Sequence, residues 1–168
     1  MGGLNENEEI NNKITEEQAL AEEFKKLKEC NDLPITSCEY VNNNIKHWKI
    51  EFEGSKFSPY EDGIFILELI FNKGLFPKNG PEAKFITKMF HPNIDCNGKV
   101  CINLLNSWNP TISIVSVIFG ILEILDNPIA SGGYSNDARK LLESNEEKYY
   151  KTVQEYTMTY AKNPINIK

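Results

Sequence analysis

The residues of this chain best suited to chemistry lie at positions 91–110, HPNIDCNGKVCINLLNSWNP. Cys101 is a candidate nucleophile, because a thiolate can attack a carbonyl carbon and form a thioester. Asn93 precedes it by eight residues, and its side-chain amide could donate a hydrogen bond to the oxyanion that such an attack creates. Pro92 fixes its own φ angle and restricts His91, so this turn can hold the Asn93 amide in one place.

The same residues also allow a purely structural interpretation. Residues 91–93 would then form an ordinary turn. Cys101, between Val100 and Ile102, would be a small buried core residue. Local physics alone favours this second interpretation, so the choice depends on what surrounds the segment.

Helices and strands around the segment are predicted from hydrophobic periodicity and from capping residues. Thr15, followed three residues later by Gln18, predicts a capping box that opens a helix ending near Asn31. Apolar alternation or continuous apolar runs predict strands at residues 37–41, 47–53, 64–71 and 82–87. Further helices are predicted at residues 113–125, which are apolar on nearly every side, and at 136–143 and 146–161. This order of elements indicates the α+β class.

Length and composition suggest one domain. The chain has 168 residues, enough to bury a single core, and we expect residues 1–14 to be a flexible polar tail and residues 15–168 to form one domain. No apolar run has the length of a membrane span, and the first residues lack the features of a secretion signal. We therefore expect an intracellular protein, in the cytoplasm or the nucleus, with no membrane partner.

Charge and cysteine content exclude other classes of site. A net charge of −6, with scattered lysines, argues against a nucleic-acid partner. The four cysteines are expected to be reduced thiols in an intracellular chain. His91, Cys96 and Cys101 could suggest zinc, but the chain has no CxxC pair and only two histidines. We expect neither a metal nor a cofactor.

The ordered motifs resemble the active-site segment of the ubiquitin-conjugating enzymes. That segment carries His-Pro-Asn, a glycine, a cysteine between apolar residues, and Trp-x-Pro. Here these are residues 91–93, Gly98, 100–102 and 108–110. The resemblance extends from about residue 19 to about residue 163, and includes His47-Trp48, Ser58-Pro59-Tyr60, Phe76-Pro77 and Asn127-Pro128.

The resemblance implies a fold and a reaction. The fold would be an N-terminal helix, a four-stranded antiparallel meander, an active-site loop, a buried central helix and two C-terminal helices. Cys101 would accept ubiquitin or a ubiquitin-like modifier from an activating enzyme as a thioester, in an ATP-dependent pathway, and pass it to a substrate lysine, usually with a ligase. Asn93 would stabilise the intermediate or hold the loop that does. His91 and Pro92 would support the turn, and Asn103 would either orient the substrate or bond within its loop.

The chain departs from the family pattern beside the acceptor lysine. Many members place an acidic residue in the loop after the Asn-Pro, where this chain has Ala130 or Ser131, depending on the alignment, and the nearest downstream acid is Asp137. Desolvation could suffice there, another carboxylate could reach in, or a partner could supply the group.

Partner surfaces carry over in part. The resemblance places Lys25 and Lys26 on the surface for the activating enzyme, and Pro110 and Thr111 on the surface for a ligase. Lys78 stands where the family usually has an exposed aromatic residue of that ligase surface.

Alternative functions remain open at this point. Some details, Asp95 and Asn103 among them, look closer to the conjugating enzyme of the Nedd-type modifier. An inactive scaffold of the same fold is a different class of function, although such variants lack the cysteine that this chain retains. A cysteine hydrolase using His91 and Cys101 would need an oriented imidazole base, and no clear orienting partner is present.

Overall fold

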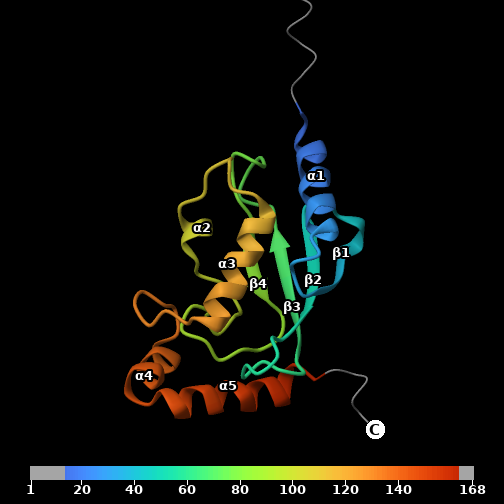
Figure 1. Cartoon of the computed structure of the whole chain (residues 1–168). Helices are drawn as coiled ribbons and strands as arrows, with labels where there is room; N and C mark the ends of the chain where they lie inside the picture. The colour runs from blue at the N-terminus through green and yellow to red at the C-terminus, as the bar shows by residue number, and fades with distance from the viewer. Residues whose placement is uncertain (1–13, 163–168) are drawn as a thin grey trace, which may run out of the picture.

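The computed structural model describes residues 14–162. Its elements are, in chain order, α1 (Glu16–Glu29), β1 (Ile35–Tyr40), the short 3-10 helix η1 (Val41–Asn43), β2 (His47–Glu53), β3 (Ile64–Ile70), β4 (Glu82–Phe85), α2 (Asn103–Asn106), α3 (Ile114–Asp126), α4 (Asn136–Ser144) and α5 (Glu146–Tyr160) (Figure 1). The predicted α+β class is confirmed. The tail predicted over residues 1–14 falls, apart from Ile14, outside the described residues.

The first helix begins as its capping residues predicted. The Thr15 hydroxyl accepts a hydrogen bond from the Gln18 backbone N–H at 3.2 Å, and the Gln18 side chain accepts one from the Thr15 backbone N–H at 2.9 Å. These reciprocal bonds satisfy N–H groups that have no partner within the helix. The capping box is therefore confirmed.

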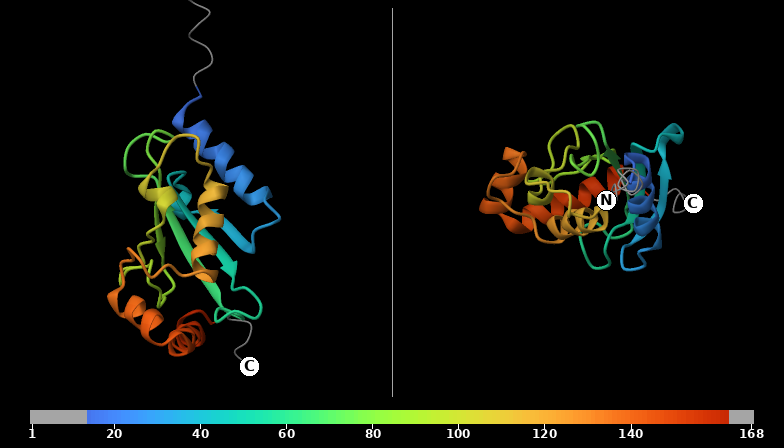
Figure 2. Two further views of the ribbon diagram at one scale, coloured as in Figure 1. Left: turned by 60° about the vertical axis from the view of Figure 1, so that its left-hand side comes forward. Right: turned by 90° about the horizontal axis from the view of Figure 1, so that it is seen from above.

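The four strands form one antiparallel sheet in the order β1-β2-β3-β4, which is the predicted meander. In β2 and β3, buried side chains alternate with more exposed ones, and the register sets Trp48 beside Leu69 and Phe52 beside Phe65. Helices α1 and α3 cover this buried face, while α4 and α5 lie at one end of the sheet (Figures 1 and 2). The ring of Phe24 on α1 meets that of Trp48 edge-on at 5.0 Å.

Two strand boundaries differ from the sequence prediction by two residues each, and one short helix was not predicted. Strand β1 begins at Ile35, two residues early, with an irregularity in register between Ile35 and Ser37. Strand β4 ends at Phe85 rather than at residue 87, because the Ile66 N–H pairs with the Thr87 hydroxyl, at 2.9 Å, in place of a backbone carbonyl. The four-residue helix α2 was not predicted, because one turn is too short to show a helical period.

Within residues 14–162, no helix combines the length and the apolar character needed to cross a membrane.

Candidate active site

The turn at His91 is fixed by bonds to both ring nitrogens. The His91 ring is 1% exposed, its Nδ1 accepts a hydrogen bond from the Asn93 backbone N–H at 3.0 Å, and its Nε2 lies 2.7 Å from the carbonyl oxygen of Ile124. Because Nδ1 accepts, Nε2 carries the hydrogen and donates to Ile124 on α3. Burial lowers the pKa of His91 to about 4. The imidazole is thus uncharged near neutral pH and has a structural role. Both of its nitrogens are already hydrogen-bonded, so neither can bond to the Cys101 thiol.

Asn93 joins the turn to two other segments. Its side chain is buried, and Oδ1 accepts a hydrogen bond from the Ile129 backbone N–H at 3.1 Å, in the loop after α3. Its own carbonyl accepts a hydrogen bond from the Cys101 N–H at 2.8 Å. An amide that accepts through Oδ1 still has two Nδ2 hydrogens to donate. Asn93 therefore holds the loop, and remains able to serve as a donor.

The loop between Asn93 and Cys101 is a tight hairpin laid against β4. Asp95 Oδ1 accepts hydrogen bonds from the backbone N–H groups of Asn97 and Lys99, both at 2.8 Å. Gly98 has a φ of 86°, and a Cβ there would lie 2.0 Å from the Phe85 carbonyl oxygen. The hairpin consequently requires glycine at this position.

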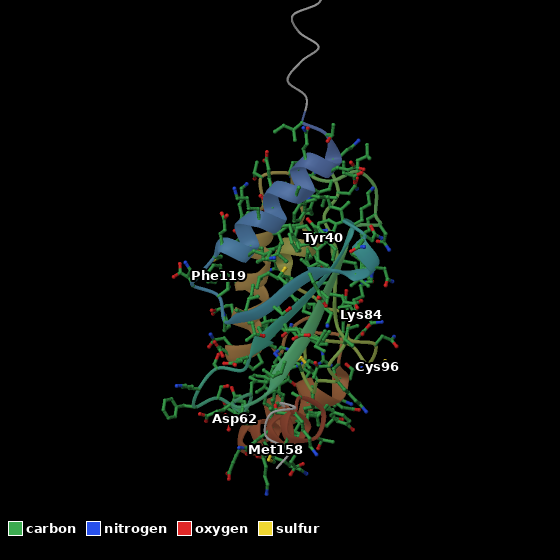
Figure 3. The ribbon with its side chains drawn as sticks, turned by 90° about the vertical axis from the view of Figure 1, so that its right-hand side faces the viewer. Tyr40, Asp62, Lys84, Cys96, Phe119 and Met158 are labelled. Carbon is green, nitrogen blue, oxygen red and sulfur yellow. The ribbon has the colours of Figure 1, made fainter. Side chains whose placement is uncertain are left out.

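The tip of this hairpin lies over the edge of the sheet. Cys96 is exposed, and it lies on the same side of the molecule as Lys84 of β4 (Figure 3). A groove runs from here to the loop before α4, and its lining includes Asp95, Tyr134 and Asp137. Asp95 and Asp137 are the carboxylates that line this groove, and Tyr134 and Tyr156 are its phenols.

Cys101 points out of the core. It is half-buried, whereas its neighbours Val100 and Ile102 are buried. Its Sγ lies 3.4 Å from the side-chain Nδ2 of Asn106, the last residue of α2. No pattern in the sequence predicts this contact, because it depends on a helix too short to show a period. Asn103, the first residue of α2, is exposed.

The loop after α3 lies directly on the turn. The Ser135 N–H donates to the Pro92 carbonyl oxygen at 3.0 Å, and a Cβ on Gly133 would lie 2.3 Å from that same oxygen. Ala130 is half-buried and Ser131 is exposed. Neither is acidic, so the loop carries no carboxylate at the position where the family pattern would place one.

Tyr134, between Gly133 and Ser135, lies near Cys101. Desolvation raises the pKa of its phenol, and the nearby Cys101 thiol raises that pKa further. Sequence reasoning missed this residue, because a tyrosine in a glycine-rich loop has no periodicity that would reveal its target.

The residues predicted to contact partner proteins lie in the C-terminal half of α1 and in two loops, residues 76–81 and 108–113. Lys26 Nζ lies 2.7 Å from Glu23 Oε1, whereas Lys25 is 3.9 Å from Glu29 and largely exposed. Lys78, Pro110 and Thr111 are exposed, and the Trp108 indole N–H donates to the Pro77 carbonyl oxygen at 2.8 Å. The structure thus brings the loops of residues 76–81 and 108–113 together.

The described part of the chain gives little support for a metal site, a disulfide or a reactive thiol at Cys38. No group of three or more His, Cys, Asp or Glu side chains within residues 14–162 could hold a metal ion. All four cysteines are unpaired. Burial raises the pKa of Cys38 to about 11, so that thiol is unreactive near neutral pH.

Comparison with known proteins decides the family. A sequence model of the family described as ubiquitin-conjugating enzyme matches residues 19–157. This chain belongs to the ubiquitin-conjugating enzyme family. Membership makes it an E2-type transferase, whose partners are in general ubiquitin, activating enzymes and ligases.

Individual ubiquitin-conjugating enzymes match most of the chain. Ubiquitin-conjugating enzyme E2 13 of Saccharomyces cerevisiae is 34% identical over 131 residues, which are 77% of this chain and 85% of that protein. Ubiquitin-conjugating enzyme E2 1 of Caenorhabditis elegans is 34% identical over 137 residues, 81% of this chain and 70% of the relative. The E2 domain of a Toxoplasma gondii ubiquitin-conjugating enzyme matches with a TM-score of 0.76 and 27% identity, covering 86% of this chain and 98% of that one. The predicted fold of the family is confirmed.

Proposed function

We propose that this protein carries ubiquitin as a thioester on Cys101 and transfers it to a substrate lysine. The observation that carries the proposal is the bond from the Cys101 N–H to the Asn93 carbonyl, at 2.8 Å, which ties the thiol-bearing residue to the buried amide. The half-buried Cys101 side chain leaves the sulfur accessible to an incoming thioester. The family's general role supports the same assignment.

The first transfer needs no base in this site. The Cys101 thiolate attacks the thioester carbonyl carbon, a new C–S bond forms, and the activating enzyme's sulfur leaves as a thiolate when the old C–S bond breaks. Both ring nitrogens of His91 are engaged elsewhere, which fits an exchange between two sulfurs. The same engagement argues against a cysteine hydrolase, since hydrolysis needs an oriented imidazole.

The second transfer is aminolysis. The neutral lysine nitrogen attacks the thioester carbon, loses a proton to water or to a carboxylate, and expels Cys101 as a thiolate. Asn93 is our candidate donor to the oxyanion of this step. Ala130 and Ser131 cannot take the proton, and Asp95 and Asp137 are the carboxylates that line the adjoining groove.

Partner assignments follow the exposed surfaces. We assign Lys25 and Lys26 to the activating enzyme, and Lys78, Pro110 and Thr111 to a ligase, because the latter three lie on loops that Trp108 holds together. An ATP-dependent activating enzyme implies activity in the cytoplasm or the nucleus. No cofactor enters either transfer.

Ubiquitin is the modifier we favour, since the relatives named above are ubiquitin-conjugating enzymes. The Nedd-type modifier is the second candidate, on the strength of Asp95 and Asn103. An inactive scaffold is the third candidate. It is favoured by the lack of an acidic residue at Ala130 or Ser131, in the loop beside the acceptor lysine.

Thioester charging tests the proposal. The protein is mixed with ATP and, in parallel, with ubiquitin or the Nedd-type modifier and the matching activating enzyme, and run on non-reducing gels beside Cys101→Ala. A thiol-sensitive adduct that disappears in the variant supports the carrier role, and its lane names the modifier. An adduct that survives in Cys101→Ala would refute the nucleophile, and no adduct in either lane would favour the scaffold.

A further inference from the structure

Helix α2 presents an amide group to the sulfur of Cys101. Asn106 Nδ2 lies 3.4 Å from Sγ, within the range of an N–H···S hydrogen bond. The backbone fixes this approach, because the N–H groups of Leu105 and Asn106 both donate to the Ile102 carbonyl oxygen at 3.1 Å. The helix therefore folds back immediately after the nucleophile, and its last residue faces the sulfur.

Helix α2 is also held from outside, so this geometry does not depend on its own single turn. On one side, Leu104 lies against α3, where a Cβ on Gly120 would be 3.0 Å from its Cδ1. On the other side, Trp108 follows the helix and is bonded to the Pro77 carbonyl oxygen at 2.8 Å. A four-residue helix clamped in this way can aim a side chain despite its length.

Two amides near Cys101 have different targets. Asn93 is buried, and its side-chain oxygen is occupied by the Ile129 N–H. Asn106 is exposed, and its nitrogen approaches the sulfur itself. Because sulfur accepts hydrogen bonds weakly as a thiol and well as a thiolate, an N–H donor favours the charged form.

We infer that Asn106 is a catalytic residue, whose Nδ2–H donates to Cys101 Sγ and stabilises the thiolate. The inference rests on the proposed function of Cys101 as acyl carrier. In the first transfer the thiolate is the attacking group, and the bond to Asn106 increases its population. In the second, the C–S bond breaks, sulfur keeps the electron pair, and the same N–H stabilises the departing thiolate while the lysine nitrogen becomes an amide.

Alkylation of Cys101 with iodoacetamide tests this role without any activating enzyme. The rate is followed from pH 6 to pH 10 by mass spectrometry of the Cys101 peptide, which separates it from the other three cysteines. We expect Asn106→Ala to react about three- to tenfold more slowly at pH 7, and the midpoint of its pH profile to move upward, since a hydrogen bond to a charged group is lost. Asn106→Asp, with the same shape but a negative charge, should react more slowly still.

Ser107→Ala is the matched control. Ser107 is the next residue, is also exposed, and uses its backbone N–H to bond to the Asn103 carbonyl oxygen. Its alkylation profile should overlay that of the wild type. If Asn106→Ala also overlays the wild type, the inference is wrong. Circular dichroism of each variant checks that the substitution has not unfolded the protein. If Asn106→Ala is unfolded, Asn106→Asp, which has nearly the same size and shape as asparagine, still tests the inference.

Charging assays separate this inference from the proposed function. If wild-type protein fails to charge with either modifier but the Asn106 variants still alkylate slowly, the acyl-carrier proposal fails and the sulfur–amide interaction stands. If alkylation is unchanged and only charging is lost, Asn106 contacts a partner protein, which contradicts a role at the sulfur.

Discussion

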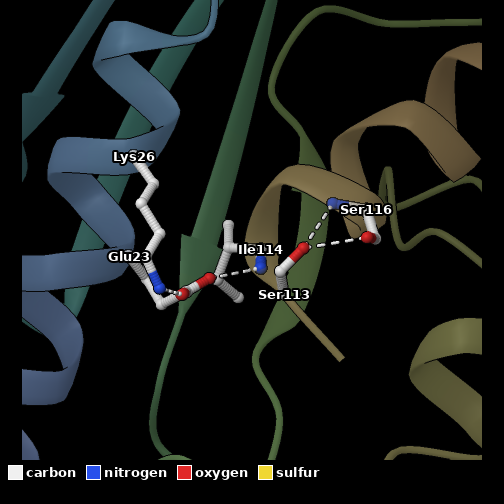
Figure 4. Close-up of polar contacts among 5 residues, drawn as sticks. All are labelled: Glu23, Lys26, Ser113, Ile114 and Ser116. Atoms are coloured by element: carbon white, nitrogen blue, oxygen red, sulfur yellow. Dashed lines mark hydrogen bonds and ion pairs between the residues drawn. The ribbon is translucent and has the colours of Figure 1, made fainter. Parts of the chain in front are cut away.

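The carboxylate of Glu23 on α1 accepts a hydrogen bond from the backbone N–H of Ile114, the first residue of α3, at 2.7 Å (Figure 4). Its other oxygen pairs with Lys26 Nζ at 2.7 Å. Ser113 caps the same helix locally, accepting from the Ser116 N–H at 3.1 Å. The start of α3 thus has a local cap and an anionic partner from a distant helix, both favourable at a helix N-terminus.

Replacement of Glu23 should therefore reduce stability. We expect Glu23→Ala to lower the free energy of unfolding by about 1 to 2 kcal/mol, as for loss of a helix cap. Urea denaturation measures the change. Glu22→Ala, exposed on the same turn, is the control and should lie within about 0.5 kcal/mol of the wild type. Equal losses in the two variants would contradict a capping role for Glu23.

Two substitutions at Asn93 separate its possible roles. Asn93→Ala removes both the bond to Ile129 and the amide donor, and should slow lysine transfer about a hundredfold. Asn93→Asp keeps an oxygen for the Ile129 N–H but has no N–H to donate. Single-turnover discharge of the thioester to free lysine measures both. If the Asn93 amide donates to the oxyanion, Asn93→Asp should be as slow as Asn93→Ala. If Asn93 only holds the loop, Asn93→Asp should retain most of the wild-type rate.

Stability should depend on His91 in mildly acidic solution. Its pKa is about 4 in the folded protein and about 6.5 when unfolded, so the unfolded chain binds the proton more tightly between these values. The free energy of unfolding consequently falls as pH drops below about 6.5, by about 2 kcal/mol at pH 5, and this contribution stops changing below about pH 4.

His91→Gln removes that titration. Denaturant unfolding of both proteins at pH 7.5 and pH 5 should show a smaller pH-dependent loss in the variant, whatever its stability at pH 7.5. Taking this difference cancels the contribution of the carboxylates, which titrate in both proteins. Equal losses in the two proteins would mean that folding does not lower the pKa of His91, and would contradict the prediction.

Gly98→Ala should affect both fold and activity. The positive φ disfavours any side chain, and the added Cβ would meet the Phe85 carbonyl oxygen, so we expect a loss of at least about 2 kcal/mol. Gly132→Ala is a suitable comparison, because Gly132 also has a positive φ, 75°, but no atom lies within 4 Å of its added Cβ. A thermal melt that ranks Gly132→Ala as the less stable variant would contradict the steric argument.

Much of the fold could be predicted because its elements are long and periodic. The Thr15–Gln18 capping box and the alternation in β2 are local patterns, and each is present as predicted. Helix α2 escaped because four residues cannot show a period. The end of β4 was missed because it depends on the Thr87 hydroxyl reaching a different strand.

The candidate site divides in the same way. Cys101 and Asn93 could be proposed from the sequence because their motif lies within one short segment, residues 91–110. Asn106 and Tyr134 were not, because the first depends on the short turn of α2 and the second on a loop that closes over Pro92. The ion pair between Lys26 and Glu23 could have been predicted from the sequence, because residues three apart on a helix are neighbours.

The hairpin that leads to Cys101 also occupies the outer edge of β4. Phe85 N–H donates to the Gly98 carbonyl at 2.8 Å, and Val100 N–H donates to the Ala83 carbonyl at 3.0 Å. Without these bonds, the strand would offer unpaired backbone groups to a second molecule. A substitution that loosens the hairpin is therefore expected to promote intermolecular strand pairing as well as inactivity, so poor solubility and lost catalysis should appear in the same variants.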